Sequence, residues 1–182
     1  MVTSYIALLR AVNLAGLNKV AMADLRALVS DLGFEDPRTL LMSGNVVFSA
    51  RSGSSERIEA TLEKRAPKKL GVTTDFFVRT ASEWSTMIAA NPFTIEAKRD
   101  PGYLVVMILK SAPSRARVNV LNEAIKGHEE VRVKGKHAYV VYPEGVGRSK
   151  LSVALIEKSL GTRGTGRNWN TVLKLAALAK AG

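Results

Sequence analysis

One order of predicted strands and helices occurs twice along this chain, and the repetition constrains the fold more than any other feature. A strand, a helix, two strands, a helix and a strand follow one another from Val2 to Arg79. The same order returns after residue 102 and ends in a short extended piece, residues 162–165, and a last helix. The halves share no visible sequence identity, so only the order of elements is repeated.

Hydrophobic spacing and turn residues define these elements. In the first helix, apolar residues recur at helical spacing from Met22 to Leu32, and Gly33 is a helix stop. Strands are predicted over residues 2–12, 37–42, 46–50, 72–79, 103–110, 130–134 and 137–142, and further helices over residues 58–66, 113–125 and 149–160. The order βαββαβ is the ferredoxin-like arrangement. The sequence therefore predicts an α+β fold with duplicated ferredoxin-like halves and additional helices.

The predicted domain organisation follows from the repeat. Residues 1–90 form the first half together with a short helix, and residues 103–182 form the second half with the C-terminal helix. Residues 91–102 are the candidate linker, because Pro92 disfavours helical geometry in the residue before it. We expect the halves to form one compact unit.

Several strands are apolar at every position, as in Tyr5–Leu9, residues 103–109 and residues 138–142. A strand with one solvated face would alternate polar and apolar residues, so these strands are expected to be buried on both faces. The halves then bury their sheets either against each other or behind the additional helices.

Composition narrows the class of protein. The 182 residues include no Cys, which excludes disulfides and thiolate chemistry. No apolar run is long enough to span a membrane, and the apolar start lacks the basic leading segment of a signal peptide. We therefore expect a soluble cytoplasmic protein without a membrane partner. The sequence leaves its oligomeric state open.

The positive charge is concentrated in the second half. Residues 1–90 carry 11 Lys and Arg against 9 Asp and Glu, whereas residues 91–182 carry 16 against 7. Clustered cations attract phosphate groups, so a polyanion is one candidate partner. A basic surface that serves only solubility is the alternative.

The first candidate site is the Gly-rich stretch from Gly145 to Lys150, which we expect to enter a helix. Such a loop lets backbone N–H groups approach an anion, and a helix start presents unpaired donors. Arg148 and Lys150 add positive charge, and Ser149 either donates to a ligand or caps the helix. Gly145 and Gly147 are spaced differently from the glycines of a phosphate-binding P-loop. A capped helix after a flexible turn explains the stretch equally simply.

The second candidate site is the stretch TGRNWNTV, at the start of the last helix. Trp169 is expected to anchor that helix in the core, and Asn168 or Asn170 to cap it. Arg167 and Thr171 would lie on one side if the helix begins early, which would make a second anion-receptive helix start. Capping and core packing alone remain the alternative.

A third group of polar residues follows the first strand. Arg10, Asn13 and Lys19 lie at its end and in its loop, where α/β scaffolds often place binding sites. Arg10 ends a run suited to burial, so its charge requires a partner or an opening to solvent.

The sequence gives less support to RNA binding, metal binding or nucleophilic catalysis. Residues 138–142 match the end of an RNA-recognition signature, but strands buried on both faces leave no open surface for stacking bases. The two His residues, His128 and His137, lack a metal-ligand pattern, so no metal and no cofactor is indicated. No Gly-x-Ser-x-Gly nucleophile elbow is present.

Several stretches together resemble the bacterial domain-of-unknown-function family 1697: residues 5–50, the NPF at 91–93, YPEGVGRSKL and TGRNWNTVLKLAALA. The resemblance extends from Tyr5 to about Ala179. In the family pattern Arg10 is followed by Gly-Ile-Asn, whereas here Ala11 replaces the Gly and Asn13 matches. The resemblance implies a duplicated ferredoxin-like fold. It implies no activity, substrate or cofactor.

The leading functional hypothesis is a protein that binds a phosphate-containing ligand, a nucleotide or a nucleic acid, through cationic helix starts. One alternative is an enzyme acting on a small anionic metabolite. The other is an oligomeric or partner-binding structural protein. Whether the polar motifs line one pocket distinguishes the first two classes from the third.

Overall fold

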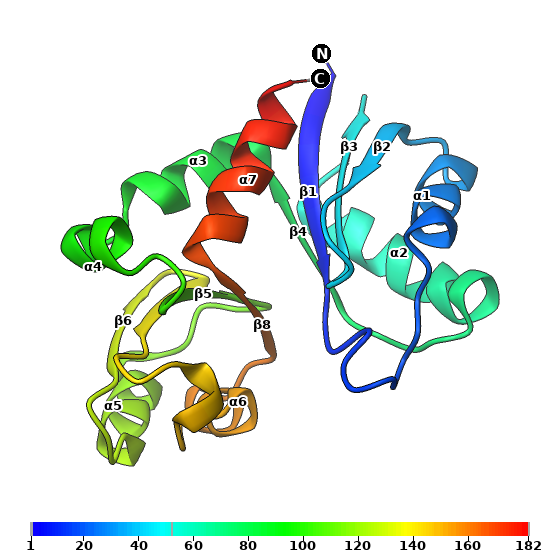
Figure 1. Cartoon of the computed structure of the whole chain (residues 1–182). Coiled ribbons are helices and arrows are strands. Elements are labelled where there is room, and N and C mark those ends of the chain that lie inside the picture. The colour runs from blue at the N-terminus through cyan, green and yellow to red at the C-terminus, as the bar shows by residue number, and fades with distance from the viewer. Residues whose placement is uncertain (1, 52, 182) are drawn as a thin grey trace. The chain divides into compact units, whose positions relative to one another are not determined.

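A computed structural model describes residues 2–51 and 53–181 of the chain (Figure 1). The structure divides into two compact units. The first comprises Met1–Thr86 and Lys174–Gly182, and the second comprises Met87–Leu173. Each unit contains one four-stranded antiparallel sheet.

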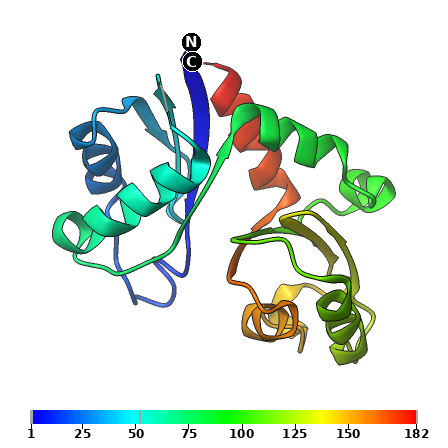
Figure 2. The same cartoon turned by 180° about the vertical axis from the view of Figure 1, so that it is seen from behind.

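The first unit has the order βαββαβ. Its elements are β1 (Thr3–Leu9), α1 (Met22–Asp31), β2 (Glu35–Thr39), β3 (Asn45–Ala50), α2 (Ser55–Leu70) and β4 (Phe76–Thr80). The strands lie in the order β2-β3-β1-β4. Both helices cover the same face of this sheet, which is the ferredoxin-like arrangement (Figure 2).

The second unit repeats this topology. Its elements are β5 (Leu104–Leu109), α5 (Arg115–Ala124), β6 (Glu130–Lys134), β7 (His137–Val141), α6 (Val153–Leu160) and β8 (Gly164–Asn168). The strands lie in the order β6-β7-β5-β8, which corresponds position by position to the first sheet. The predicted duplication of a ferredoxin-like half is confirmed.

Three additional helices complete the fold: α3 (Ala81–Ala89), α4 (Thr94–Arg99) and α7 (Trp169–Lys180). The boundary between the units falls within α3, after Thr86, and again within α7, after Leu173. Residues 91–102, which the sequence suggested as a linker, contain α4. Within the described ranges no helix is long and apolar enough to cross a membrane.

Each unit has its own core between its sheet and its helices. In the first unit Leu25 and Val29 of α1 and Leu62 of α2 pack against β1 and β3. In the second unit Leu121 of α5 and Ile156 of α6 take the same place. Every residue from Tyr5 to Leu9 and from 138 to 142 is buried, which confirms the predicted burial of these two strands on both faces. In the third strand predicted to be buried, residues 103–109, Tyr103 is exposed and burial begins at Leu104.

Most elements appear where hydrophobic spacing predicts them, and the differences are at their ends. The second strand spans Glu35–Thr39 instead of residues 37–42, because the chain passes Pro37 while still paired to β3. The fourth strand starts at Phe76 instead of residue 72. The helix expected from residue 149 begins at Val153, where the hydroxyl of Ser152 accepts a hydrogen bond from the Leu155 N–H at 3.2 Å.

Candidate functional site

A small polar cleft lies in the second unit, between the segment that precedes β6 and the segment that follows β7. Its volume is about 200 Å³. It is lined by Lys126, Gly127, His128, Glu129, Tyr142, Pro143, Glu144, Gly145, Arg148, Ser149 and Lys150. Four residues of the predicted Gly-rich site are therefore brought together with a segment some twenty residues earlier in the chain.

The Gly-rich stretch forms a tight turn of its own and does not enter a helix. Gly145 has φ +84°, a left-handed conformation that favours glycine, and its N–H donates to the Tyr142 carbonyl at 2.9 Å. Residues Val146–Arg148, with Gly147 in the middle, form one 3₁₀ turn. Ser149 then returns to extended geometry. The prediction that this stretch enters a helix is wrong, and of the two roles considered for Ser149 the helix cap is excluded.

Ser149 instead joins the two walls of the cleft. Its hydroxyl donates a hydrogen bond to Oε1 of Glu129 and accepts one from the Leu151 N–H at 2.9 Å. The Ser149 hydrogen bond is the main cause of a lowered pKa of Glu129, and the N–H groups of Glu129 and Gly127 lower it further. This carboxylate is therefore held in its charged form by donors around it.

The Glu129 carboxylate occupies space that a side chain at position 127 would fill, and this position is glycine. A Cβ atom at position 127 would lie 2.4 Å from Oε2 of Glu129, well inside contact distance. The absence of a side chain at this position thus leaves room for the carboxylate to lie where it does.

Tyr142 forms a buried part of the lining. Its hydroxyl donates to the Leu151 carbonyl at 3.1 Å. Burial, followed by the negative charge of Glu129, raises the pKa of Tyr142 to about 12, so the phenol is neutral at physiological pH. It supplies a fixed wall to the cleft and no charge.

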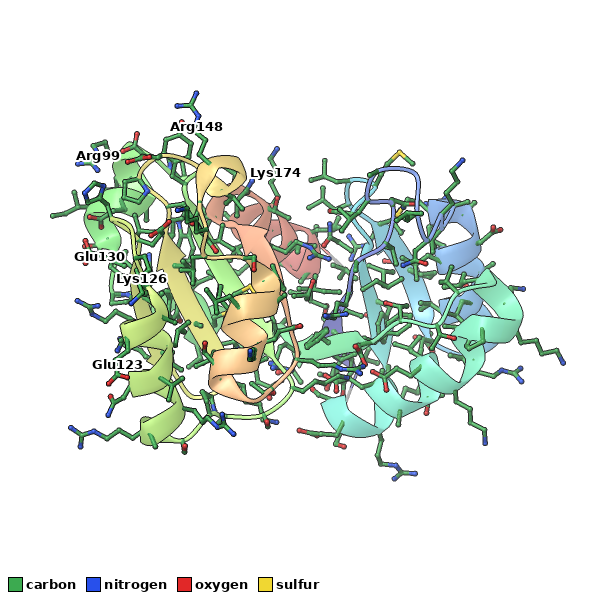
Figure 3. The ribbon with its side chains drawn as sticks, turned by 90° about the horizontal axis from the view of Figure 1, so that it is seen from below. Arg99, Glu123, Lys126, Glu130, Arg148 and Lys174 are labelled. Atoms are coloured by element: carbon green, nitrogen blue, oxygen red, sulfur yellow. The ribbon has the colours of Figure 1, made fainter. Side chains whose placement is uncertain are left out.

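The rim of the cleft is cationic on one side. Arg148 and Lys150 are exposed, and Figure 3 shows Arg148 pointing away from the ribbon. Neither side chain has a hydrogen-bonding or ion-pair partner among the described residues. The other ionisable side chains of the cleft do have partners. Lys126 donates to the Glu123 carbonyl at 3.1 Å, and Nδ1 of His128 lies 3.3 Å from Oε1 of Glu144.

The start of the last helix serves the core and lies outside the cleft. Oδ1 of Asn168 accepts from the Thr171 N–H at 3.0 Å, which confirms an Asn cap, and Trp169 is buried as predicted. Asn170 is exposed. Arg167 belongs to β8 instead of a helix start, so it does not share a helix side with Thr171.

Arg167 is a buried cation, 9% exposed. Its Nη1 atom donates to Oγ1 of Thr165 at 2.8 Å and to the Gly166 carbonyl at 2.9 Å. Burial lowers the pKa of Arg167 to about 10, which leaves the guanidinium charged at neutral pH. Its hydrogen bonds within β8 indicate a structural role.

The three polar residues after the first strand lie in the first unit and line no part of the cleft. The side chain of Asn13 donates to the carbonyls of Val20 and Met42, at 2.9 and 2.7 Å, and accepts from the Val20 N–H at 2.8 Å. These bonds use both amide donors and the side-chain carbonyl of Asn13 to hold the loop. The Arg10 carbonyl accepts from Oγ1 of Thr74 at 2.7 Å, and Lys19 is exposed.

Base stacking and a bound metal find no support in the geometry. Tyr139 and Tyr142, the aromatic residues of the RNA-recognition match, are 0% and 3% exposed. The hydroxyl of Tyr139 donates to the Met87 carbonyl at 2.6 Å, so neither ring is available to a base. Across residues 2–51 and 53–181 no group of three or more His, Asp or Glu side chains gathers as metal ligands.

The fold and the cleft define an α+β protein of two ferredoxin-like halves with a small polar cleft in the second half. The family model for the protein of unknown function DUF1697 matches residues 2–139, so the chain belongs to this family, as its motifs indicated. A solved structure, "conserved bacterial protein SP0830 from Streptococcus pneumoniae", is similar with a TM-score of 0.76 and 21% identity. The match covers 98% of this chain and 99% of that one, and at this identity it concerns the fold alone. No curated protein matches this chain.

Proposed function

We propose that the second unit binds a small anion, such as an inorganic phosphate or the terminal phosphate of a nucleotide, in the cleft beside Arg148 and Lys150. Among the described residues, the three predicted polar motifs do not line one pocket, so the proposal concerns the Gly-rich stretch alone. One observation carries it. Both carboxylates of the cleft, Glu129 and Glu144, have partners within it, whereas the cations Arg148 and Lys150 have none among the described residues. A guanidinium presents paired donors that match phosphate oxygens, and an ammonium adds a point charge.

The size of the cleft limits the ligand. Pockets that enclose whole drug-sized molecules measure about 300–1,000 Å³. A cleft of about 200 Å³ accommodates a phosphate group with a small substituent and leaves the remainder of a nucleotide in solvent. The proposed recognition therefore concerns the anionic group, with little discrimination between bases.

Ligand-induced thermal stabilisation tests the proposal. We expect inorganic phosphate, pyrophosphate and ATP, each at constant ionic strength, to raise Tm with a saturable dependence on concentration. Binding to the folded state alone stabilises it by about 2.7 kcal/mol at a ligand concentration of about 100 times Kd. If none of these anions raises Tm beyond a matched chloride control, the proposed function is wrong.

Variants test the assignment of the site. Arg148→Ala and Lys150→Ala should each weaken the stabilisation, and the double substitution should abolish it. Lys158→Ala is the matched control, because it removes an exposed cation of the same unit that does not line the cleft. Equal stabilisation of the double variant and this control would place the anion elsewhere.

An enzyme acting on a small anionic metabolite is a second candidate, favoured by the His128–Glu144 contact in the same cleft. A His beside a carboxylate suits general acid–base catalysis. Turnover of a panel of phosphate esters that is lost in His128→Ala, while phosphate binding remains, would favour this candidate. Binding without turnover would favour a binding protein.

A further inference from the structure

The four edge strands of the two sheets are protected unequally. An edge strand exposes backbone groups that can pair with another chain unless the protein covers or interrupts them. Along β4, helix carboxylates cover the edge. The N–H groups of Phe76, Val78 and Thr80 donate to Glu63, Glu59 and Glu83 at 2.9, 2.8 and 2.7 Å.

Two further edge strands, β2 and β8, are protected from pairing with another chain in other ways. In β2, Pro37 has no N–H to offer, and the pairing with β3 shifts between Glu35 and Arg38. In β8, the Gly164 N–H donates to Oε1 of Glu157 on α6 at 2.9 Å. Each device makes pairing with an added strand unfavourable.

β6 has none of these devices among the described residues, and its edge is protected only by the charged side chains of Glu130, Arg132 and Lys134. It contains no proline, and its register with β7 is regular from Glu130 to Lys134. No carboxylate from a helix accepts from its backbone within the described part of the chain. Among the described elements, no helix or strand lies alongside its outer edge in Figures 1 and 2, and Glu130 lies at the outer margin of the unit in Figure 3. The equivalent strand of the first half, β2, is the one interrupted by Pro37.

The sequence of β6 is nearly complementary to itself in antiparallel pairing. If two copies pair about an axis at Arg132, Glu130 of each copy lies opposite Lys134 of the other, and Val131 lies opposite Val133. Opposite charges and apolar side chains in such positions stabilise a sheet. Lys134 already donates to the Ala90 carbonyl at 2.7 Å, and an ammonium has two further donors for a carboxylate.

Arg132 is the one mismatch, because it would lie opposite Arg132 of the second copy. Its guanidinium lies over the ring of Phe93 at 5.8 Å, and Nη2 is 3.8 Å from Oε2 of Glu130. These contacts hold the charge over its own unit. The mismatch and the net charge of +11 per chain keep the association weak.

We propose that β6 is a self-association edge, through which two copies of this chain pair antiparallel about Arg132 and join their second sheets into one. To match the charges of β6, an extended peptide from another protein would need a Glu and a Lys four residues apart in the antiparallel orientation. A second copy of β6 already has this arrangement, so we take the partner to be a second copy of this chain. The proposal is independent of anion binding, since β6 does not line the cleft.

Charge reversal at the two ends of β6 tests this register. Sedimentation of the full chain over a wide concentration range should show a reversible monomer–dimer equilibrium. Lys134→Glu places two carboxylates opposite each other at both ends, so the dimer Kd should rise about ten-fold or more. Glu130→Lys should act similarly, and the combined E130K/K134E should restore the original Kd. Arg132→Thr should tighten the dimer.

Lys158→Glu is the control, because it makes the same charge change on α6. It should leave the dimer unchanged or slightly tighter. A wild-type chain that remains monomeric at every concentration would overturn the proposal. Equal weakening by K134E and K158E, or failure of the double variant to restore pairing, would overturn it as well. Since Glu130 and Lys134 are exposed, all variants are expected to fold, which circular dichroism checks.

Discussion

Arg79 and Arg167 occupy equivalent positions in the two halves of the molecule. Each is the next-to-last residue of the fourth strand of its unit, directly before the residue that precedes a helix. Each guanidinium donates from Nη1 to the carbonyl of the preceding residue, Val78 at 2.8 Å and Gly166 at 2.9 Å. The duplication thus extends to the placement of a buried cation, although the surrounding sequences differ.

Arg79 is stabilised by a buried carboxylate, and removing that carboxylate should be costly. Oε1 of Glu59 lies 3.5 Å from Nη1 of Arg79, and both side chains are nearly inaccessible. The same oxygen accepts the Val78 N–H at 2.8 Å. Breaking one partner of a buried ion pair costs about 3–5 kcal/mol. We expect Glu59→Ala to lower the free energy of unfolding by that amount in urea denaturation.

Lys64→Ala is the control for Glu59→Ala, because Lys64 is an exposed residue of the same helix. Its free energy of unfolding should stay within about 0.5 kcal/mol of the wild type. A loss for Glu59→Ala as small as this would mean that the ion pair contributes little.

Asn13 should affect stability and leave anion binding unchanged. Asn13→Ala removes three hydrogen bonds that join its loop to Val20 and Met42, whereas Asn18→Ala removes one, to the Ala11 carbonyl at 3.1 Å. Both Asn residues have φ near +50°, so the backbone strain introduced by Ala is matched. We expect Asn13→Ala to be the less stable variant by about 1–3 kcal/mol. Equal stabilities, or loss of phosphate binding in Asn13→Ala, would contradict this assignment.

Gly44 is required both for its backbone conformation and for its lack of a side chain. Its φ is +76°, and a Cβ atom would lie 2.7 Å from Cγ2 of Val12 and 2.9 Å from Cβ of Leu9. Gly33 has a similar φ of +80° with open space around it. Gly33→Ala should therefore cost about 1 kcal/mol from the backbone, and Gly44→Ala about 1–3 kcal/mol more from overpacking. Thermal or urea unfolding of both variants measures the difference.

Most of the fold could be predicted because burial leaves a periodic pattern. The sequence pattern shows directly which faces are buried. Examples are the apolar run from Tyr5 to Leu9 and the helical spacing of Leu25, Leu28 and Val29. Arg167 was harder to place, because the strand Gly164–Asn168 contains no apolar residue. The segment Gly164–Asn168 forms a strand because it pairs with β5, where Arg167 lies opposite Val106.

Only one wall of the cleft, the Gly-rich stretch, could be predicted from the sequence. Arg148, Ser149 and Lys150 stand out in the sequence as a basic group after glycines, but Glu129 is twenty residues away and looks like an ordinary surface carboxylate. The hairpin of β6 and β7 brings them together, because Glu130 pairs with Val141. In a hairpin, the residue before the first strand lies next to the residues that follow the second strand. The predicted hairpin therefore already implied that Glu129 lies near the Gly-rich stretch.

The Ser149–Glu129 hydrogen bond gives a prediction that depends on pH. Because the bond favours the charged carboxylate, Ser149→Ala should raise the pKa of Glu129 toward its ordinary value, with the backbone donors still holding it somewhat low. A carboxyl group with a lowered folded-state pKa adds stability above its unfolded pKa. That stability is lost as the pH falls through the folded-state value. The effect on stability is small because solvent screens this partly exposed group, so the pKa itself is the better measurement.

Carbon-detected NMR titration of the Glu129 carboxyl group measures that pKa in the wild type and in Ser149→Ala. Ser152→Ala is the matched control, since Ser152 caps α6 through the Leu155 N–H and has no bond to Glu129. We expect an upward shift in the pKa of Glu129 for Ser149→Ala and none for Ser152→Ala. An unchanged pKa in Ser149→Ala would mean that the hydroxyl does not hold the carboxylate in solution. The two walls of the cleft would then be joined by the His128–Glu144 contact and by the hairpin.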